Sequence, residues 1–146
     1  MSIRAVICST LIALVGSGEV YARSCRTADL VGVWYGTSSI VNSANSAMNY
    51  SLNCRLQFKK RGSGADLENG ECKAVSSNPD IDGMENDVIS SEVMFLPKSC
   101  ELEAIVGWSG GGQSTIKGYL SLRSKEIVAT TKNTTGGVGV MNFVKE

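Results

Sequence analysis

The sequence predicts an all-β protein, an eight-stranded antiparallel up-and-down barrel with one long loop. Two observations point to this fold. The chain is full of short runs in which apolar and polar residues alternate, and Gly, Asn, Asp and Ser separate these runs. It also has no apolar pattern with the period of a helix over a helical length. Eight antiparallel strands can close into a barrel and so leave no exposed edge.

The expected strands follow one another along the chain. They cover residues 30–40, 48–60, 66–75, 88–95, 100–108, 113–122, 125–131 and 137–144. Tight connections, such as Gly62-Ser63-Gly64, favour pairing between strands that are neighbours in the sequence.

Residues 76–87 are the exception, because this polar stretch should be the longest loop, with room for a short helical turn. Its acidic residues resemble the start of a calcium-binding loop. However, Ile89 stands where the closing Glu of such a loop is needed, so we expect no metal there.

The first 22 residues have the features of a secretory signal peptide. Arg4 precedes an apolar run over 5–15, and Val20-Tyr21-Ala22 places small residues where a signal peptidase cleaves. The apolar run is shorter than the roughly 20 residues that a membrane-spanning helix needs. We therefore expect a signal peptide at 1–22, a single β-barrel domain at 23–146, and a secreted or periplasmic protein with no membrane span.

The composition argues against several functions. Lys and Arg together number 14, as do Asp and Glu, so no net charge attracts nucleic acid or an anionic membrane. The chain has no His, which is the commonest zinc ligand and acid–base catalyst. The best carboxylate pair, Glu101 and Glu103, has the spacing of one exposed face of a strand. We expect no enzyme activity, no metal and no cofactor.

Cys54 lies in the middle of the apolar face of the second expected strand and is a candidate nucleophile, metal ligand or disulfide partner. No His is present to activate a thiol, and no C-x-x-C pair is present to hold a metal. Antiparallel pairing across the turn at 62–64 places Cys54 opposite Cys72, at a distance that a disulfide accepts. The same register sets Glu68 against Phe58, which indicates a bulge near the turn.

Cys25 and Cys100 complete an even set of cysteines, since Cys8 belongs to the expected signal peptide. An even set in an oxidising compartment predicts disulfides. By elimination Cys25 should pair with Cys100, although four cysteines allow three pairings and nothing local fixes this one.

Gly32 and Trp34 form a G-x-W pattern that resembles the first strand of the calycins, which include lipocalins, avidins and small periplasmic inhibitors of bacterial metalloproteases. The resemblance implies that Gly32 and Trp34 close one end of the barrel. A series of residues is similar in order to the metalloprotease inhibitors, while the length and residues 138–143 resemble avidins. The inhibitor-like series is Ala28, Leu30, Gly32, Trp34, Cys54, Cys72, Gly107 and Trp108.

The resemblance implies a protein that binds and does not catalyse. The first interpretation is an inhibitor-like barrel whose partner is an extracellular or periplasmic protease, contacted through the N-terminal arm and residues 76–99. The alternative is an avidin- or lipocalin-like carrier of a small apolar ligand, since an eight-stranded barrel can hold one small molecule. The candidate ligand-binding residues are Tyr50, Trp108, Thr115 and Tyr119, and the resemblance to avidins adds Ser114.

Overall fold

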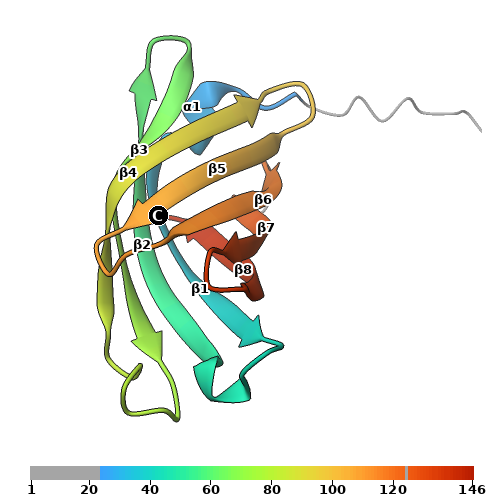
Figure 1. Cartoon of the computed structure of the whole chain (residues 1–146). Helices are drawn as coiled ribbons and strands as arrows, with labels where there is room; N and C mark the ends of the chain where they lie inside the picture. The colour runs from blue at the N-terminus through green and yellow to red at the C-terminus, as the bar shows by residue number, and fades with distance from the viewer. Residues whose placement is uncertain (1–23, 124) are drawn as a thin grey trace, which may run out of the picture.

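Eight antiparallel strands form a closed barrel, in which each strand pairs with its neighbour in the sequence and β8 pairs with β1 (Figure 1). The structure, a computed structural model, describes residues 24–123 and 125–146. The predicted signal peptide and the expected first residue of the domain lie outside the described residues. The predicted all-β barrel is confirmed.

All the expected strands are present. They are β1 (Gly32–Asn42), β2 (Tyr50–Arg61), β3 (Gly64–Val75), β4 (Glu85–Leu96), β5 (Glu101–Trp108), β6 (Gln113–Ser121), β7 (Glu126–Asn133) and β8 (Gly137–Lys145). Two short helices accompany them, α1 (Thr27–Leu30) before β1 and the 3₁₀ helix η1 (Ser46–Met48) between β1 and β2.

The start of the first strand differs from the prediction, because Leu30 is the last residue of α1. This helical turn is held by the Asp29 carboxylate, which accepts hydrogen bonds from the backbone N–H and the guanidinium of Arg26, at 2.7 and 3.2 Å. The turn buries Leu30 completely. Leu30, which the alternating pattern assigned to a strand, therefore packs into one end of the barrel as part of a helical turn.

The predicted long loop is shorter than expected and spans residues 76–84. Backbone hydrogen bonds between Ala74 and Met84 (2.8 Å) and between Gly83 and Ala74 (2.9 Å) continue the contact between β3 and β4 past their paired residues. The loop consists of turns, and the short helix of this end lies at η1 instead.

The hairpin of β2 and β3 has the predicted register. Cys54 lies opposite Cys72, and the two form a disulfide with Cα atoms 4.1 Å apart. The register shifts between Gln57 and Phe58, which is the bulge expected near the turn. A second disulfide joins Cys25 to Cys100, as expected by elimination.

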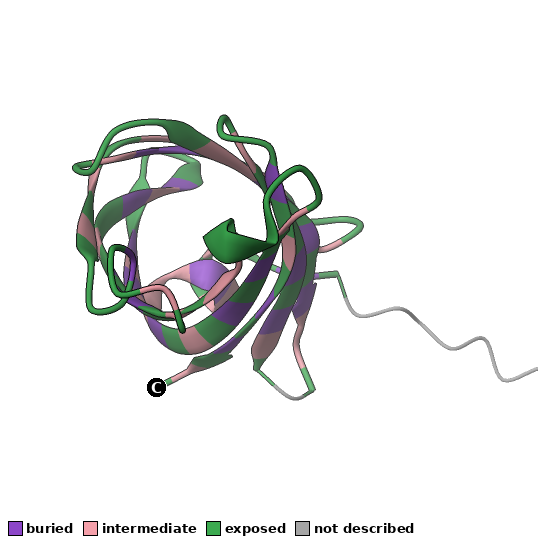
Figure 2. Ribbon diagram, turned by 60° about the horizontal axis from the view of Figure 1, so that its bottom comes forward, coloured by how far each residue is buried: buried purple, intermediate pink, exposed green. Residues whose placement is uncertain are grey.

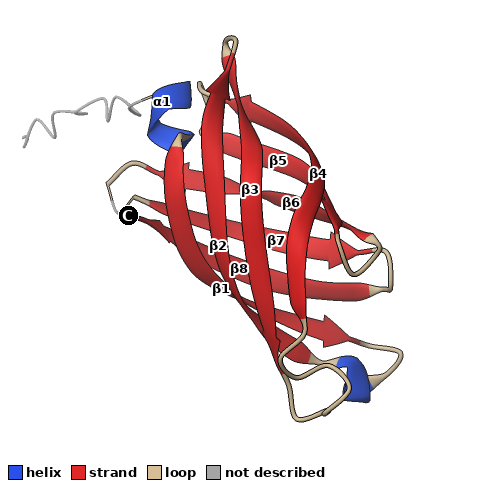
Figure 3. Cartoon of the chain, turned by 90° about the vertical axis from the view of Figure 1, so that its left-hand side faces the viewer, coloured by secondary structure: helices blue, strands red, loops and turns tan. Residues whose placement is uncertain are grey.

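Buried and exposed residues alternate along the ring of strands (Figure 2). The inward side chains fill one end of the barrel, the end that α1 covers (Figure 3). Trp34 is completely buried there, and its indole N–H donates to the Leu30 carbonyl at 2.8 Å. Gly32 begins the same strand. Trp34 thus lies at the closed end of the barrel, and the closing role that the resemblance assigned to Gly32 and Trp34 stays a prediction.

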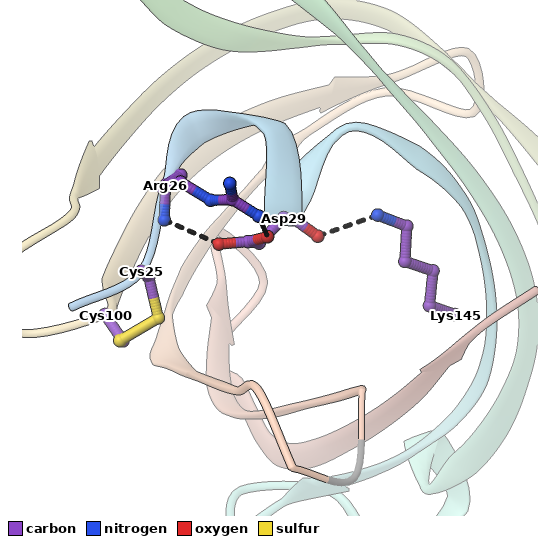
Figure 4. Close-up of polar contacts among 5 residues, drawn as sticks. All are labelled: Cys25, Arg26, Asp29, Cys100 and Lys145. Carbon is purple, nitrogen blue, oxygen red and sulfur yellow. Dashed lines mark hydrogen bonds and ion pairs between the residues drawn. A yellow bond between two sulfur atoms is a disulfide. The ribbon is translucent and has the colours of Figure 1, made fainter. Parts of the chain in front are cut away.

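The Lys145 side chain and a disulfide also hold this closed end together (Figure 4). The Lys145 ammonium donates to the Asp29 carbonyl at 2.8 Å and lies 5.6 Å from the centre of the Trp34 ring. The disulfide of Cys25 with Cys100 ties the chain two residues before α1 to the chain just before β5. The closed end is therefore held by packing, hydrogen bonds and a covalent link.

The opposite end is bordered by the loops 43–49, 76–84, 109–112 and 134–136, and η1 lies among them (Figure 3). We call it the open end. Within the described residues, no helix has the length and hydropathy needed to cross a bilayer, and no group of three or more Cys, Asp or Glu side chains is placed to hold a metal ion.

Candidate ligand-binding cavity

The open end of the barrel contains a cavity of about 210 Å³. Inward-facing residues from the strand ends form its floor and walls, and the surrounding loops form its mouth. None of the described side chains that line it carries a charge. A charged group in this cavity would find no charged partner among the described lining residues, and a buried charge without a partner is costly.

The floor of the cavity is apolar. Leu52 and Ala74 lie opposite each other on β2 and β3, and Cys72, already in a disulfide, lies two residues before Ala74. Ile40 and Met141 complete the floor from β1 and β8. Ala74 is small, so it leaves open the space that large side chains fill at the closed end.

Four polar residues form an arc along the mouth: Tyr50, Asn133, Ser114 and Trp108, which we call the polar arc. Ser114 and Asn133 lie directly opposite each other on β6 and β7. The Trp108 indole N–H donates to the Ser114 hydroxyl oxygen at 2.9 Å, and the Asn133 amide donates to the Tyr50 hydroxyl oxygen at 3.3 Å.

Gly137 fixes the orientation of Asn133. Its backbone N–H donates to Asn133 Oδ1 at 2.6 Å, and an N–H group can only donate, so the amide nitrogen of Asn133 must face Tyr50. A Cβ at position 137 would lie 2.7 Å from Asn133 Nδ2 and 2.8 Å from the Ile40 side chain. Only glycine leaves room for this contact.

Burial raises the pKa of the Tyr50 phenol above its ordinary value of 10.0, and the hydrogen bond from Asn133 offsets part of this shift. Tyr50 therefore keeps its hydroxyl proton throughout the neutral range. It serves the cavity as an uncharged hydrogen-bonding group.

Ser38 lies just beyond the cavity floor on β1. It is 1% exposed, and its hydroxyl has no hydrogen-bond partner among the described residues. Its cross-strand neighbours, Leu52 and Met141, both line the cavity. A buried hydroxyl without a partner lowers the free energy of unfolding by about 1 to 3 kcal/mol, so a serine is unfavourable at position 38 if that position serves packing alone.

The structure brings only some of the predicted ligand-binding residues to this cavity. Tyr50, Trp108 and Ser114 line it. Thr115 and Tyr119 do not, which corrects their expected place in the lining. Both belong to the outward-facing residues of β6, and Tyr119 is 60% exposed.

Asn133 was missed by the sequence reasoning, because the seventh strand was expected to end at Thr131. The observed strand continues to Asn133, and alternation from the buried Thr131 places Asn133 on the inner face. A correct strand end would have identified it.

A larger hollow, of about 680 Å³, lies on the outer wall over β1 to β4. Charged side chains line it, among them Arg55, Glu71 and Lys73, and Lys73 forms an ion pair with Glu85 at 3.2 Å. Glu71, Lys73 and Glu85 are exposed. We interpret this hollow as the solvated outer face of the sheet.

No family model matches the chain, and no curated protein matches it. The solved structures that are similar to it include designed barrels. A redesigned β-barrel bound to DFHBI is 12% identical, with a TM-score of 0.53, covering 80% of this chain and 99% of that chain. A second redesigned β-barrel is also 12% identical, with a TM-score of 0.53, covering 84% of this chain and 96% of that chain.

A de novo designed fluorescence-activating β-barrel is 14% identical, with a TM-score of 0.52, covering 80% of this chain and 93% of that chain. At these identities the likeness establishes the fold alone, a closed antiparallel barrel. No family match supports the resemblance to metalloprotease inhibitors or avidins, so both stay predictions.

Proposed function

We propose that the protein is a non-enzymatic binding protein that holds one small molecule in the cavity at the open end. The observation that carries the proposal is the cavity itself, about 210 Å³, with an apolar floor, a polar arc at its mouth and no charge on the described side chains that line it. Apolar walls with a few placed polar groups are typical of small-molecule sites.

The volume limits the ligand. Apolar cavities of about 150 Å³ admit benzene, and sites for drug-sized ligands begin at about 300 Å³. A cavity of about 210 Å³ suits a single ring with a short substituent. Two similar designed barrels, one bound to DFHBI and one fluorescence-activating, are compatible with small-molecule binding in a barrel of this kind.

The absence of catalysis is part of the same proposal. The sequence has no His, and the described lining residues include no carboxylate, lysine or arginine to act as an acid or base. Tyr50, the one described lining residue with a titratable side chain, has a raised pKa and so is poorly suited to proton transfer near neutral pH.

Filling the cavity tests the proposal. Ala74→Phe adds a ring to the floor, whereas Val75→Phe adds the same ring to the outer face of the same strand, where Val75 is 50% exposed. We expect calorimetric titration with single-ring compounds to show binding to the wild type and to Val75→Phe, and at least about tenfold weaker binding to Ala74→Phe.

Overpacking costs about 1 to 3 kcal/mol, so circular dichroism and denaturant unfolding of each variant accompany the titration, and Ala74→Leu gives a milder step. Undiminished binding to a folded Ala74→Phe would place the ligand elsewhere and contradict the proposal.

We also propose that the protein is exported, to the periplasm or the exterior. Its two disulfides support this location, because disulfides persist in oxidising compartments. Mass spectrometry of the protein from its host should find a chain that begins at residue 23 and contains no free thiol. Retention of residues 1–22 together with five free thiols would contradict export.

Inhibition of a protease ranks second. In the inhibitor family an extended N-terminal arm enters the protease. Here Cys25 is buried and disulfide-bonded, and its N–H donates to the Pro97 carbonyl at 2.9 Å. With the expected cleavage after Ala22, only Arg23 and Ser24 would precede that anchor. The geometry therefore favours the small-molecule function.

A further inference from the structure

Two hydroxyl groups at the mouth of the cavity, those of Tyr50 and Ser114, have the same bias: their oxygen atoms already accept hydrogen bonds from the protein. The Tyr50 oxygen accepts from Asn133, and the Ser114 oxygen accepts from Trp108. No hydrogen bond donated by either hydroxyl is found among the described residues. Each hydroxyl therefore keeps its hydrogen available for a ligand.

Asn86, on another side of the mouth, repeats the pattern. Its Oδ1 accepts from the backbone N–H of Gly110 at 3.1 Å, which leaves its NH₂ group as the unused part of the amide. The Thr134 hydroxyl oxygen likewise accepts from the backbone N–H of Gln113 at 3.2 Å. In Asn86 and Thr134, as in Tyr50 and Ser114, the side-chain oxygen accepts a hydrogen bond from the protein, and the N–H or O–H hydrogens stay available to a ligand.

We propose that the ligand is a neutral, mainly apolar molecule that carries a hydrogen-bond acceptor, such as a carbonyl, to which the hydroxyls of Tyr50 and Ser114 donate. This inference rests on the proposed function, because it concerns the occupant of the same cavity. The uncharged lining excludes a carboxylate or an ammonium group as the preferred ligand. The apolar floor takes the hydrocarbon part.

Ser38 is an independent indication that this interior is adapted to a polar group. Its buried hydroxyl has no partner and lies beside two floor residues, Leu52 and Met141. A barrel selected for packing alone would place an apolar side chain there, since an unpaired buried hydroxyl destabilises the fold.

A matched pair of probes separates shape from hydrogen bonding. Acetophenone and α-methylstyrene have nearly the same shape, but only acetophenone has a carbonyl oxygen in place of a methylene group. Tyr50→Phe removes the proposed donor while keeping the ring. Tyr119→Phe, which removes the same hydroxyl from the exposed outer face, is the control.

We expect calorimetric titration to show that Tyr50→Phe weakens acetophenone binding about fivefold, the effect of losing one neutral hydrogen bond, and changes α-methylstyrene binding less than twofold. Tyr119→Phe should change neither. Benzoate, which adds a charge to the same ring, should bind the wild type at least about tenfold more weakly than acetophenone.

The outcomes distinguish this inference from the proposed function. If both probes bind the wild type and Tyr50→Phe weakens both equally or neither, the acceptor preference is wrong and the cavity remains a binding site. Tighter binding of benzoate than of acetophenone would overturn the neutral ligand. If neither probe binds the wild type, this inference falls together with the small-ligand function.

Discussion

The two ends of the barrel are built from the same strands but in opposite ways. At the closed end, Leu30 and Trp34 are completely buried, and a disulfide and the Lys145 side chain hold α1 in place. At the open end, Met48 and Met84 are 37% and 46% exposed, in loops around a cavity.

The difference lies in side-chain volume and in polarity. Phe58 and Phe143 fill the interior toward α1, whereas Ala74 and Cys72 line the cavity floor. A solid end stabilises a small barrel, so the other end is free to carry a polar arc and adaptable methionines. We infer that stability and binding are separated along the barrel axis.

The largest effects should come from the disulfides, and the closed-end link should matter more. Removing the Cys25–Cys100 link, with a sequence separation of 75, should cost about 4.5 kcal/mol in the chain-entropy model. Removing the Cys54–Cys72 link, with a separation of 18, should cost about 3 kcal/mol. Urea unfolding of the two double alanine variants measures both, and the reverse order would break the comparison.

Truncating one apolar side chain at each end should show the same asymmetry on a smaller scale. Leu30→Ala removes the fully buried side chain at the end of α1 and should cost about 2 to 4 kcal/mol. Met48→Ala, at the mouth, should cost less than about 1 kcal/mol. Equal losses in denaturant unfolding would show that the mouth packs as firmly as the closed end.

Substitution of Ser38, which lies between the packed end and the cavity, should increase the stability of the fold, whereas the substitutions above decrease it. Ser38→Ala removes a buried hydroxyl that has no partner, so it should raise the free energy of unfolding by about 1 kcal/mol. Thermal unfolding measures the difference, with Ser39→Ala on the outer face as the control. Destabilisation by Ser38→Ala would mean that the hydroxyl is satisfied.

The smallest effect concerns pH. The backbone N–H and side chain of Arg26 hold the pKa of Asp29 below its ordinary value of 3.8. A lowered folded-state pKa gives a stabilisation that is present above pH 3.8 and is lost as the pH falls through the folded-state value. Asp29→Asn should therefore flatten the loss of stability in acid, as measured by urea unfolding at a series of pH values.

Ligand binding should depend less on pH than the stability of the closed end does, because no charged residue among those described lines the cavity and the pKa of Tyr50 is raised. The dissociation constant of a neutral probe should stay constant between about pH 5 and 9, since Tyr50 remains protonated there. A pronounced dependence in that range would mean that an ionising group contacts the ligand.

Much of the fold could be predicted from the sequence because local rules determine it. Alternation and tight turns gave the strands and their antiparallel order, and the position of one turn gave the opposition of Cys54 and Cys72. The helical turn α1 could not be found in this way. Its four residues are too few for a periodic signal, and it depends on the specific contacts of Asp29 with Arg26.

The candidate site was predicted only in part. Tyr50 and Trp108 were placed on its lining, but Thr115 and Tyr119 share the outward face of β6 with the exposed Lys117. That lysine was the signal that the face points to solvent. The contact between Asn133 and Tyr50 joins strands that are not neighbours in the barrel, so it required the closed three-dimensional arrangement.

The two tryptophans allow the central claim to be tested in one measurement. The Trp108 indole N–H lies at the mouth of the cavity, and that of Trp34 is bonded to Leu30 at the closed end. In a ¹H–¹⁵N NMR titration with acetophenone, we predict that the Trp108 indole signal shifts in a saturable way and that the Trp34 signal does not. A saturable shift of Trp34 alone, or no shift of Trp108 at saturation, would contradict a ligand site at the open end.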